Sequence, residues 1–131
     1  MGFAANLNAL CQRAGDKAEL VVRETALELQ INMVEPSPVD EGRFKNNWVA
    51  SIGAVDTTNT HAPDKSGAGA IARTVAVLDQ WTPGQTIWLV NSMPYAKKLE
   101  DGSSTQAPSG VVRLAVQACG DALAKAVSEL K

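Results

Sequence analysis

Apolar residues recur every three or four positions over residues 3–34, which is the spacing of one face of an α-helix. They are Phe3, Leu7, Leu10, Ala14, Ala18, Val22, Ala26, Leu29 and Met33. A continuous helix of about 30 residues would be roughly 45 Å long, which is long for a chain of 131 residues. We therefore expect Gly15 to bend or split the helix.

The second half of this helix carries further apolar residues on another side, namely Leu20, Leu27, Ile31 and Val34. Two apolar faces need two surfaces to pack against. Two interpretations are open at this point. One face packs on the sheet of the same domain and the other on a neighbouring subunit, or the helix is simply buried in its own core.

Two segments have the pattern of β-strands. Residues 46–55 alternate with a period of two, and Trp48, Ala50 and Ile52 share one side. Residues 85–91 are apolar on both faces, so we expect this strand to lie centrally in the sheet. Between the strands, the polar, turn-forming residues 56–69 predict a mobile loop, and residues 67–80 predict a helix.

The last third of the chain predicts a short helix over 92–102 and a final helix over 110–130. We expect Asn91 or Ser92 to cap the short helix. The apolar stripe of the final helix contains Val111, Leu114 or Ala115, Ala118, Ala122, Ala126 and Leu130. The predicted fold is α+β: one domain over 1–131, with a small antiparallel sheet packed by the long N-terminal helix and the C-terminal helix, and short helices between.

Composition narrows the classes of function. The net charge of −2 leaves no basic surface for gripping phosphates, so we do not expect a nucleic-acid reader. Charged residues interrupt the N-terminal helix, which excludes a membrane span or a secretion signal there. Cys11 and Cys119 lie in unrelated contexts without metal-ligand spacing, and we expect both to be free, buried thiols in a reducing cytosol.

The sequence offers no arrangement that predicts catalysis. His61 is the single histidine, and it stands in the polar loop without a nucleophile elbow nearby, so we expect a solvated side chain. The acidic pairs at 40–41 and 100–101 lack the spacing of a calcium loop, and there is no phosphate-binding glycine motif. We predict no enzymatic activity, no cofactor and no metal.

Two short motifs stand out because turn and capping residues crowd them. The first runs from Ser37 to Arg43 and leads to Trp48. It is either a helix-to-strand corner, with Asp40 accepting backbone N–H groups and Gly42 at positive φ, or a contact between subunits made by Arg43. The second runs from 91 to 102, followed by Gln106, Ala107 and Pro108. There we expect Pro94 in the first helical turn and Gly102 at the helix end.

The aromatic residues of the motifs have two interpretations as well. Trp48, Trp88 and Tyr95 belong to the core or line a binding pocket, and we expect the core. Residues 103–108 form either a plain linker or an exposed loop that contacts a partner.

Together, residues 36–48 and 85–113 resemble the small head–tail joining proteins of long-tailed double-stranded DNA phages, which are also called neck, tail-completion or tail-component proteins. The resemblance rests on Pro38, Val39, Asp40, Gly42, Arg43 and Trp48, and then on Asn91, Pro94, Tyr95, Ala96, Leu99, Glu100, Gly102, Gln106, Ala107 and Pro108. Each motif alone is weak, but the ordered set is specific. Residues 56–82 match nothing in the family pattern.

The resemblance implies a structural virion protein at the neck, assembled in the host cytoplasm. It implies a homo-oligomeric ring, hexameric or dodecameric, between portal-side proteins and the tail tube. Other connector and tail proteins would be its partners, and DNA would pass through the lumen without specific binding. A tail terminator or another minor tail protein is an alternative. A different class, a small ligand-binding or regulatory α+β module, predicts a pocket lined by Trp48, Trp88 and Tyr95.

Overall fold

The computed structural model describes residues 2–39, 42–94, 96–101, 110 and 112–128. The elements follow in the order α1 (Phe3–Ala14), the 3-10 turn η1 (Gly15–Lys17), α2 (Ala18–Val34), α3 (Arg43–Asn46), β1 (Trp48–Ile52), α4 (Ala68–Leu78), β2 (Ile87–Asn91), α5 (Ala96–Glu100) and α6 (Val112–Ser128). Helices combined with an antiparallel strand pair confirm the predicted α+β class.

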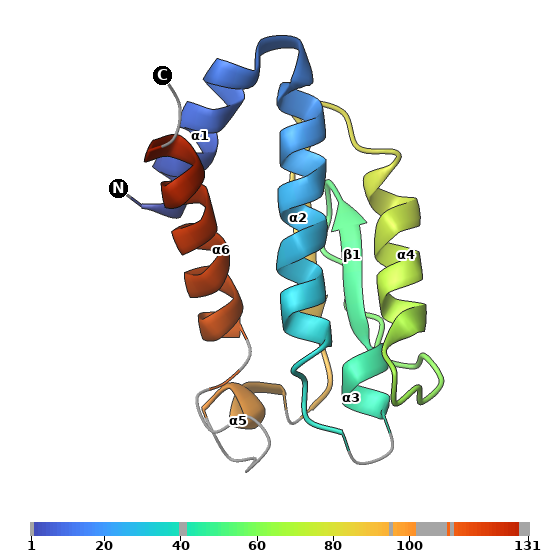
Figure 1. Ribbon diagram of the computed structural model, residues 1–131. Helices are drawn as coiled ribbons and strands as arrows, with labels where there is room; N and C mark the ends of the chain where they lie inside the picture. The colour runs from blue at the N-terminus through green and yellow to red at the C-terminus, as the bar shows by residue number, and fades with distance from the viewer. Residues whose placement is uncertain (1, 40–41, 95, 102–109, 111, 129–131) are drawn as a thin grey trace.

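The N-terminal helix is split at the glycine that the sequence singled out. Gly15 adopts a φ of 58°, and the short turn η1 reverses the chain so that α1 folds back against α2 (Figure 1). A residue with a side chain disfavours this backbone conformation. On α2, Glu19 and Arg23 form an ion pair one helical turn apart, at 3.5 Å.

The described part of the sheet consists of β1 and β2, paired in register from Trp48 opposite Asn91 to Ile52 opposite Ile87. The prediction that β2 lies centrally in the sheet is wrong, because β1 is its one neighbour among the described residues. Its apolar character on both faces does not reflect burial on both faces. Trp88 is 39% exposed on the outer face, where its indole N–H donates to the Gly53 carbonyl at 3.1 Å.

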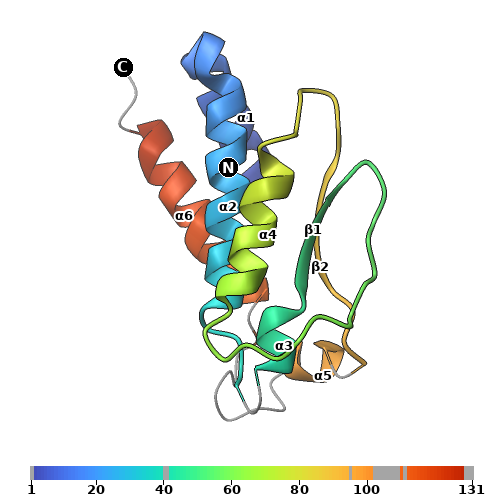
Figure 2. The same cartoon turned by 90° about the vertical axis from the view of Figure 1, so that its right-hand side faces the viewer.

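Helix α2 forms the middle of the molecule. Helices α1 and α6 pack on one flank of α2, and α4 packs on the other flank, where it also lies along β1 (Figures 1 and 2). Helix α4 packs along β1, and α2 meets the sheet in the core around Trp48, whereas α6 packs mainly on α1 and α2. The sheet is therefore covered chiefly by α4 and α2, and not by the C-terminal helix as the sequence suggested. The loop over 53–67 runs from the end of β1 to the start of α4.

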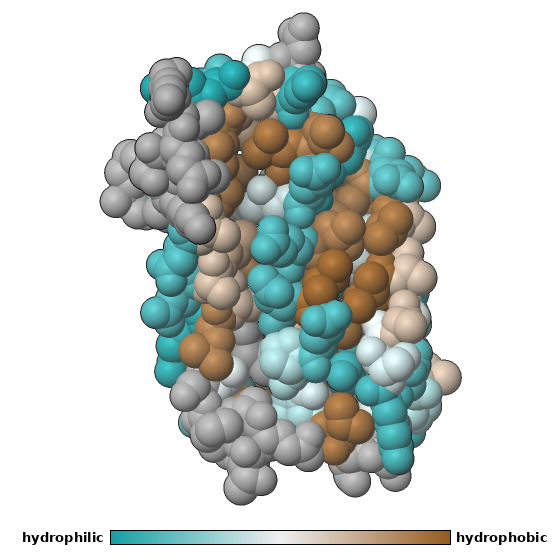
Figure 3. Space-filling view, viewed as in Figure 1, coloured by the Kyte–Doolittle hydropathy of each residue, from teal (hydrophilic) through white to brown (hydrophobic). Residues whose placement is uncertain are grey.

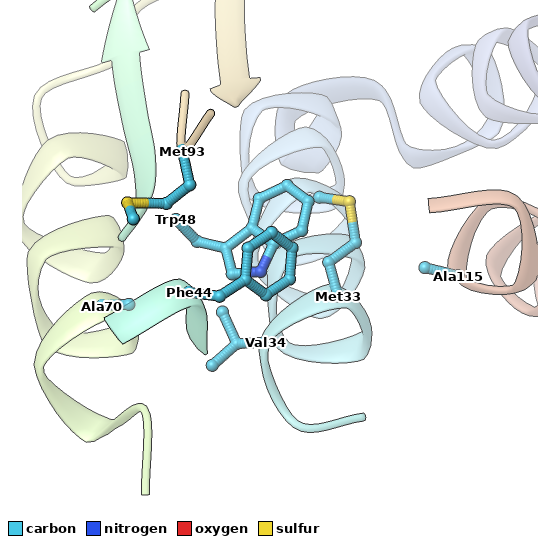
Figure 4. Close-up of a cluster of buried hydrophobic side chains, with 7 residues drawn as sticks. All are labelled: Met33, Val34, Phe44, Trp48, Ala70, Met93 and Ala115. Atoms are coloured by element: carbon cyan, nitrogen blue, oxygen red, sulfur yellow. The ribbon is translucent and has the colours of Figure 1, made fainter. Parts of the chain in front are cut away.

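The main hydrophobic core lies at the end of α2 that is close to α3 and α5 (Figure 4). Its buried members come from segments distant in sequence: Met33, Val34, Phe44, Trp48, Ala70, Met93 and Ala115. The rings of Phe44 and Trp48 meet edge to face at 5.8 Å, a favoured geometry for aromatic pairs. Leu29, Ile71, Leu89, Ala96 and Leu99 pack around this cluster.

The buried face of α6 differs from the predicted stripe. Ala115, Cys119 and Leu123 are buried, whereas Ala118 and Ala122 are exposed. The prediction was wrong because two adjacent rows of this helix are apolar, and spacing alone does not say which row faces inward. Cys119 is buried and Cys11 is half-buried, and both thiols are free. Among the described helices, none combines the length and apolar character needed to cross a bilayer.

Candidate functional site

The two sequence motifs meet in space. Trp48 ends the first motif and Asn91 begins the second, and the two residues face each other across the sheet. The Asn91 side-chain amide also donates to the Phe44 carbonyl at 2.8 Å, so it ties β2 to helix α3. Its oxygen accepts the Met93 N–H at 3.1 Å and shapes the turn after β2. Asn91 thus joins the motifs and does not cap α5, which begins only at Ala96.

A buried hydrogen-bond chain connects the first motif to the end of α2. The Trp48 indole N–H donates to the Ser37 hydroxyl at 2.8 Å, and that hydroxyl donates to the Met33 carbonyl at 2.5 Å. Ser37 is 3% exposed and Trp48 is 4% exposed. The indole N–H and the hydroxyl both have hydrogen-bond partners inside the protein. These two linked hydrogen bonds therefore fix the direction in which the backbone leaves α2.

Gly42 forms the corner that the sequence suggested. Its φ is 84°, and its carbonyl accepts the N–H groups of Asn46 and Asp64, both at 3.1 Å. A Cβ placed on Gly42 would lie 2.4 Å from the Asp64 carbonyl carbon and from the Lys65 nitrogen. The corner therefore needs glycine for its conformation and for the close approach of the loop. Arg43, the next residue, is exposed at the start of α3.

Two asparagines that sequence reasoning missed hold the loop over 53–67 against this corner. Asn46 donates to the Ala62 carbonyl at 2.8 Å and accepts the Ala70 N–H at 2.9 Å. Asn47 exchanges two bonds with the His61 backbone, at 3.2 and 3.0 Å. Both side chains are buried. Consecutive asparagines between a helix and a strand were the available signal. The mobility of the loop stays a prediction.

The second motif connects α5 to α6. The two oxygens of the Glu100 carboxylate accept the N–H groups of Val112 and Arg113 at 2.8 and 2.9 Å, so Glu100 caps α6 from a distance. Leu99 packs on the core, and Pro94 is exposed in the turn before α5. The predictions for Asp40, Tyr95, Gly102, Gln106 and Pro108 fall outside the described residues.

Removal of this distant cap should loosen the final helix. We expect Glu100→Ala to lower the free energy of unfolding by about 1 kcal/mol, the usual cost of losing a helix cap. Urea denaturation followed by circular dichroism measures the effect. Asp101→Ala is the matched control, since the neighbouring Asp101 is exposed. Equal effects of the two variants would contradict the capping role.

His61 is not the solvated side chain that we predicted. It is half-buried and lines a hollow of about 320 Å³ between β1, α4 and the loop. Asp56, Arg73 and apolar residues of β1 and α4 line the same hollow. Burial and then the positive charge of Arg73 lower the pKa of His61. The Arg73 guanidinium donates to the Asn46 carbonyl, which links this hollow to the motif corner.

The lowered pKa of His61 predicts a loss of stability in mild acid. The folded protein binds this proton less tightly than the unfolded chain, so stability is complete above about pH 6.5 and falls as the pH drops through the folded pKa. We expect a lower melting temperature at about pH 5.5 than at about pH 7.5. His61→Asn should remove this difference. The pKa values of Asp56 and Asp64 are lowered from 3.8, so their titration lies below this range.

The aromatic pocket of the alternative hypothesis does not form between the described residues. Trp88 pairs directly with Ser51 across the two strands, and directly paired residues share a face of the sheet. Since Trp48 and Ser51 are three positions apart on one strand, the two tryptophans lie on opposite faces. Trp48 belongs to the core as predicted, but the same prediction for Trp88 is wrong.

Within the described residues, no group of three or more histidine, cysteine, aspartate or glutamate side chains could hold a metal ion. The polar residues of the motif junction form hydrogen bonds mainly with backbone groups, so their chemistry is that of fixing geometry. Comparison with known proteins adds no further assignment: no family model, curated protein or solved structure matches the chain.

Proposed function

We propose that this chain is a structural protein of the phage head–tail connector, acting at the neck or in tail completion. It would assemble as a hexameric or dodecameric ring between portal-side proteins and the tail tube, and act in the virion by its shape. The tail terminator, or another minor tail protein, is the nearest alternative within the same class. The proposal starts from the two motifs of the sequence. Residues 36–48 and 85–113 resemble this family in the same order along the chain.

The observation that carries the proposal is the use of the motif residues. Ser37, Gly42, Asn91 and Glu100 direct their hydrogen bonds or their close contacts to other parts of the same chain. They join α2, α3, both strands and the start of α6 into one unit. This use of polar residues suits a protein whose function depends on a fixed shape.

The exposed apolar residues give independent support. Leu20 on α2, Val75 on α4 and Leu114 on α6 are 50%, 38% and 48% exposed. Apolar surface of this kind favours contact with another protein. The sequence did not decide whether the second apolar face of α2 packs in the core or on a neighbouring subunit. In the structure this face is buried at one end and exposed at the other. Val34 is in the core, whereas Leu20 is on the surface.

The test is assembly in the presence of the partners. Purified protein is mixed with the portal-side and tail-tube proteins of the same phage, and particles are examined by mass photometry and negative-stain microscopy. We expect closed rings on the partner, and phage lacking the protein should accumulate separate heads and tails. Monomers beside both partners, or normal infection without the protein, would overturn the proposal.

Substitution of Arg43 distinguishes the two interpretations of the first motif, a structural corner and a contact between subunits. It is exposed at the start of α3, next to the buried Gly42. We expect Arg43→Ala to leave the melting temperature within a few degrees of wild type and to reduce incorporation into particles. Lys97→Ala, another exposed cation, is the control. If Arg43→Ala unfolds the protein and loses assembly in equal measure, the corner role alone accounts for this residue.

The hollow beside His61 favours a second candidate function, a small ligand-binding or regulatory module. Its apolar walls with one arginine, one histidine and one aspartate suit a small amphipathic anion. A thermal-shift screen of carboxylates and phosphates tests this function. A rise in melting temperature that disappears in Arg73→Gln would support it, and a flat screen would remove it.

A further inference from the structure

Strand β2 has the composition of a central strand but lies at an edge of the described sheet. Ile87, Trp88, Leu89 and Val90 are all apolar, yet none of the five residues of β2 is buried. In β1, by contrast, the first three residues are buried. The strand pair lies on the side of the molecule away from α1 and α6 (Figure 2). A strand that is apolar on both faces is typical of a position between other strands.

The backbone of β2 presents hydrogen-bonding groups along this edge. The Gly53 N–H donates to the Thr86 carbonyl at 2.8 Å, so residues 86, 88 and 90 direct their backbone groups toward β1. Residues 87, 89 and 91 direct theirs away from β1. Among the described residues, the N–H and carbonyl groups of Ile87 and Leu89 have no hydrogen-bond partner. Groups of this kind are a template for the addition of another strand.

The edge lacks the features that keep an edge strand from pairing. Natural edges are blocked by charged side chains, proline, a bulge or a covering element. Residues 87–91 contain no charged residue and no proline. Their pairing with β1 is continuous, so no bulge interrupts β2. Helix α4 packs along β1. Within the described part of the molecule, the edge of β2 is therefore open to a further strand.

The other edge of the sheet is closed to such a contact. Trp48, Val49 and Ala50 of β1 are buried. Beside them lie α4 and the loop over 53–67, which Asn47 holds through its two bonds with the His61 backbone. A second copy of the chain can therefore offer β2 and not β1. A contact between identical strands is two-fold symmetric, and it closes at the dimer.

A second copy of β2 is complementary to this edge. In an antiparallel register centred on Leu89, Leu89 lies opposite Leu89 of the second copy, and Ile87 lies opposite Asn91. Each outward backbone group then meets an outward group of the other strand. On the outer face this register places Trp88 directly opposite Val90, and pairs of an aromatic and a β-branched residue stabilise sheets. Because the strand is uncharged, the two copies bring no like charges together.

We propose that two copies of the chain pair through their β2 strands into one four-stranded sheet, β1–β2–β2–β1, with Trp88 of each copy against Val90 of the other. In this dimer β2 takes the central position that its composition indicates. The pairing goes beyond the connector function and does not rest on it, since a two-fold contact leaves the ring contacts to other surfaces. One short strand makes a small interface, so we expect a dissociation constant of about 0.1–1 mM.

Amide hydrogen exchange, followed by NMR at about 0.05 and 1 mM protein, tests the pairing without any substitution. The N–H groups of Trp88 and Val90 face β1 and should be protected at both concentrations. Those of Ile87 and Leu89 face outward, and we expect them to exchange about two- to threefold more slowly at the higher concentration, because the dimer is then more populated.

Two results of the exchange experiment would overturn the proposal. The first is exchange of the outward N–H groups that does not change with concentration, together with a monomer in sedimentation at about 1 mM. The second is protection of these groups only after another protein is added. In that case the edge receives an extended segment of the added protein, and a second copy is not its occupant.

A charge at the edge should prevent the pairing. Trp88→Lys removes the contact with Val90 and adds a lysine, which is one of the residues that protect natural edge strands. Trp88 is 39% exposed, so the variant should fold. We expect it to sediment as a monomer at about 1 mM, where the wild-type protein dimerises. A variant that dimerises as well as wild type would overturn the proposal.

Val75→Lys is the matched control for this substitution. Val75 is 38% exposed, and it belongs to the apolar surface between α2 and α4 (Figure 3), away from the edge of β2. The variant should dimerise as the wild-type protein does. Loss of the dimer in this control would place the contact at the helices and overturn the pairing of the strands.

Cysteine cross-linking tests the register. Opposite residues that do not share hydrogen bonds lie about 4.5 Å apart at their Cα atoms, within reach of a disulfide. A mixture of Trp88→Cys and Val90→Cys chains should cross-link on mild oxidation about tenfold faster than either variant alone, since position 88 faces position 90 and neither faces itself. Wild-type protein, which retains Cys11 and Cys119 as free thiols, is the control. Equal or faster cross-linking of a single variant would overturn the register centred on Leu89.

Discussion

Gly42→Ala should lower the free energy of unfolding by roughly 2–4 kcal/mol, the largest effect expected for so small a change. The added Cβ would lie 2.4 Å from the Asp64 carbonyl carbon and the Lys65 nitrogen, far inside van der Waals contact. Those are backbone atoms, so no rotation of a side chain relieves the clash. The loop would have to move, and the bond from the Asp64 N–H to the Gly42 carbonyl would be lost with it. Urea denaturation with circular dichroism measures the loss.

Gly53→Ala separates the cost of the positive φ from the cost of the clash with the loop backbone. Gly53 has almost the same φ, 82° compared with 84° at Gly42, but a Cβ added there would meet no other atom within 4 Å. Its substitution should therefore cost only the conformational strain of an L-residue at positive φ, about 1 kcal/mol. The difference between the two variants reports the close approach of the loop to the corner. Equal losses would show that Gly42 matters for its conformation alone.

The sequence predicted the helices and their breaks well, because these depend on local physics. A stripe with a helical period is visible along the chain, and Gly15 interrupts it where a turn needs positive φ. The class of fold followed from the order of these patterns. The motif corner was recognisable for the same reason, since proline and glycine restrict the backbone wherever they stand.

Two of the errors share one cause, which is that spacing shows a residue's side of an element but not what covers that side. Two adjacent rows of α6 are apolar, and the wrong row was assigned to the core. The apolar run in β2 suggested a strand covered on both faces, yet one face carries the exposed Trp88. Both misassigned surfaces are apolar and exposed.

The candidate site depended on contacts between distant segments, which a pattern in one sequence does not contain. Glu100 caps a helix that begins twelve residues later. Asn46 binds the loop sixteen residues away and the first turn of α4 twenty-four residues away. The sequence indicated that the motifs set geometry. It did not indicate that Trp48 and Asn91 would be paired, because the strand register depends on the loop between them.

Trp48→Ala should be among the most destabilising substitutions in the chain, with a loss of roughly 3–5 kcal/mol. The indole is 4% exposed and packs between Phe44 and the end of α2, so its removal leaves a cavity in the main core. It also leaves the buried Ser37 hydroxyl without its donor. The free energy of unfolding from urea titration measures the loss, and retention of helical circular dichroism shows whether the helices survive.

Trp88→Ala is the control that the structure provides, with the same atoms removed from the opposite face of the same sheet. Trp88 is 39% exposed, and its indole bond to the Gly53 carbonyl is exposed too, so we expect a loss of about 1 kcal/mol or less. A loss equal to that of Trp48→Ala would mean that another surface covers Trp88 in solution. Sedimentation at several protein concentrations would then show whether a second copy or the loop over 53–67 covers Trp88. Only burial by a second copy makes the loss of stability depend on protein concentration.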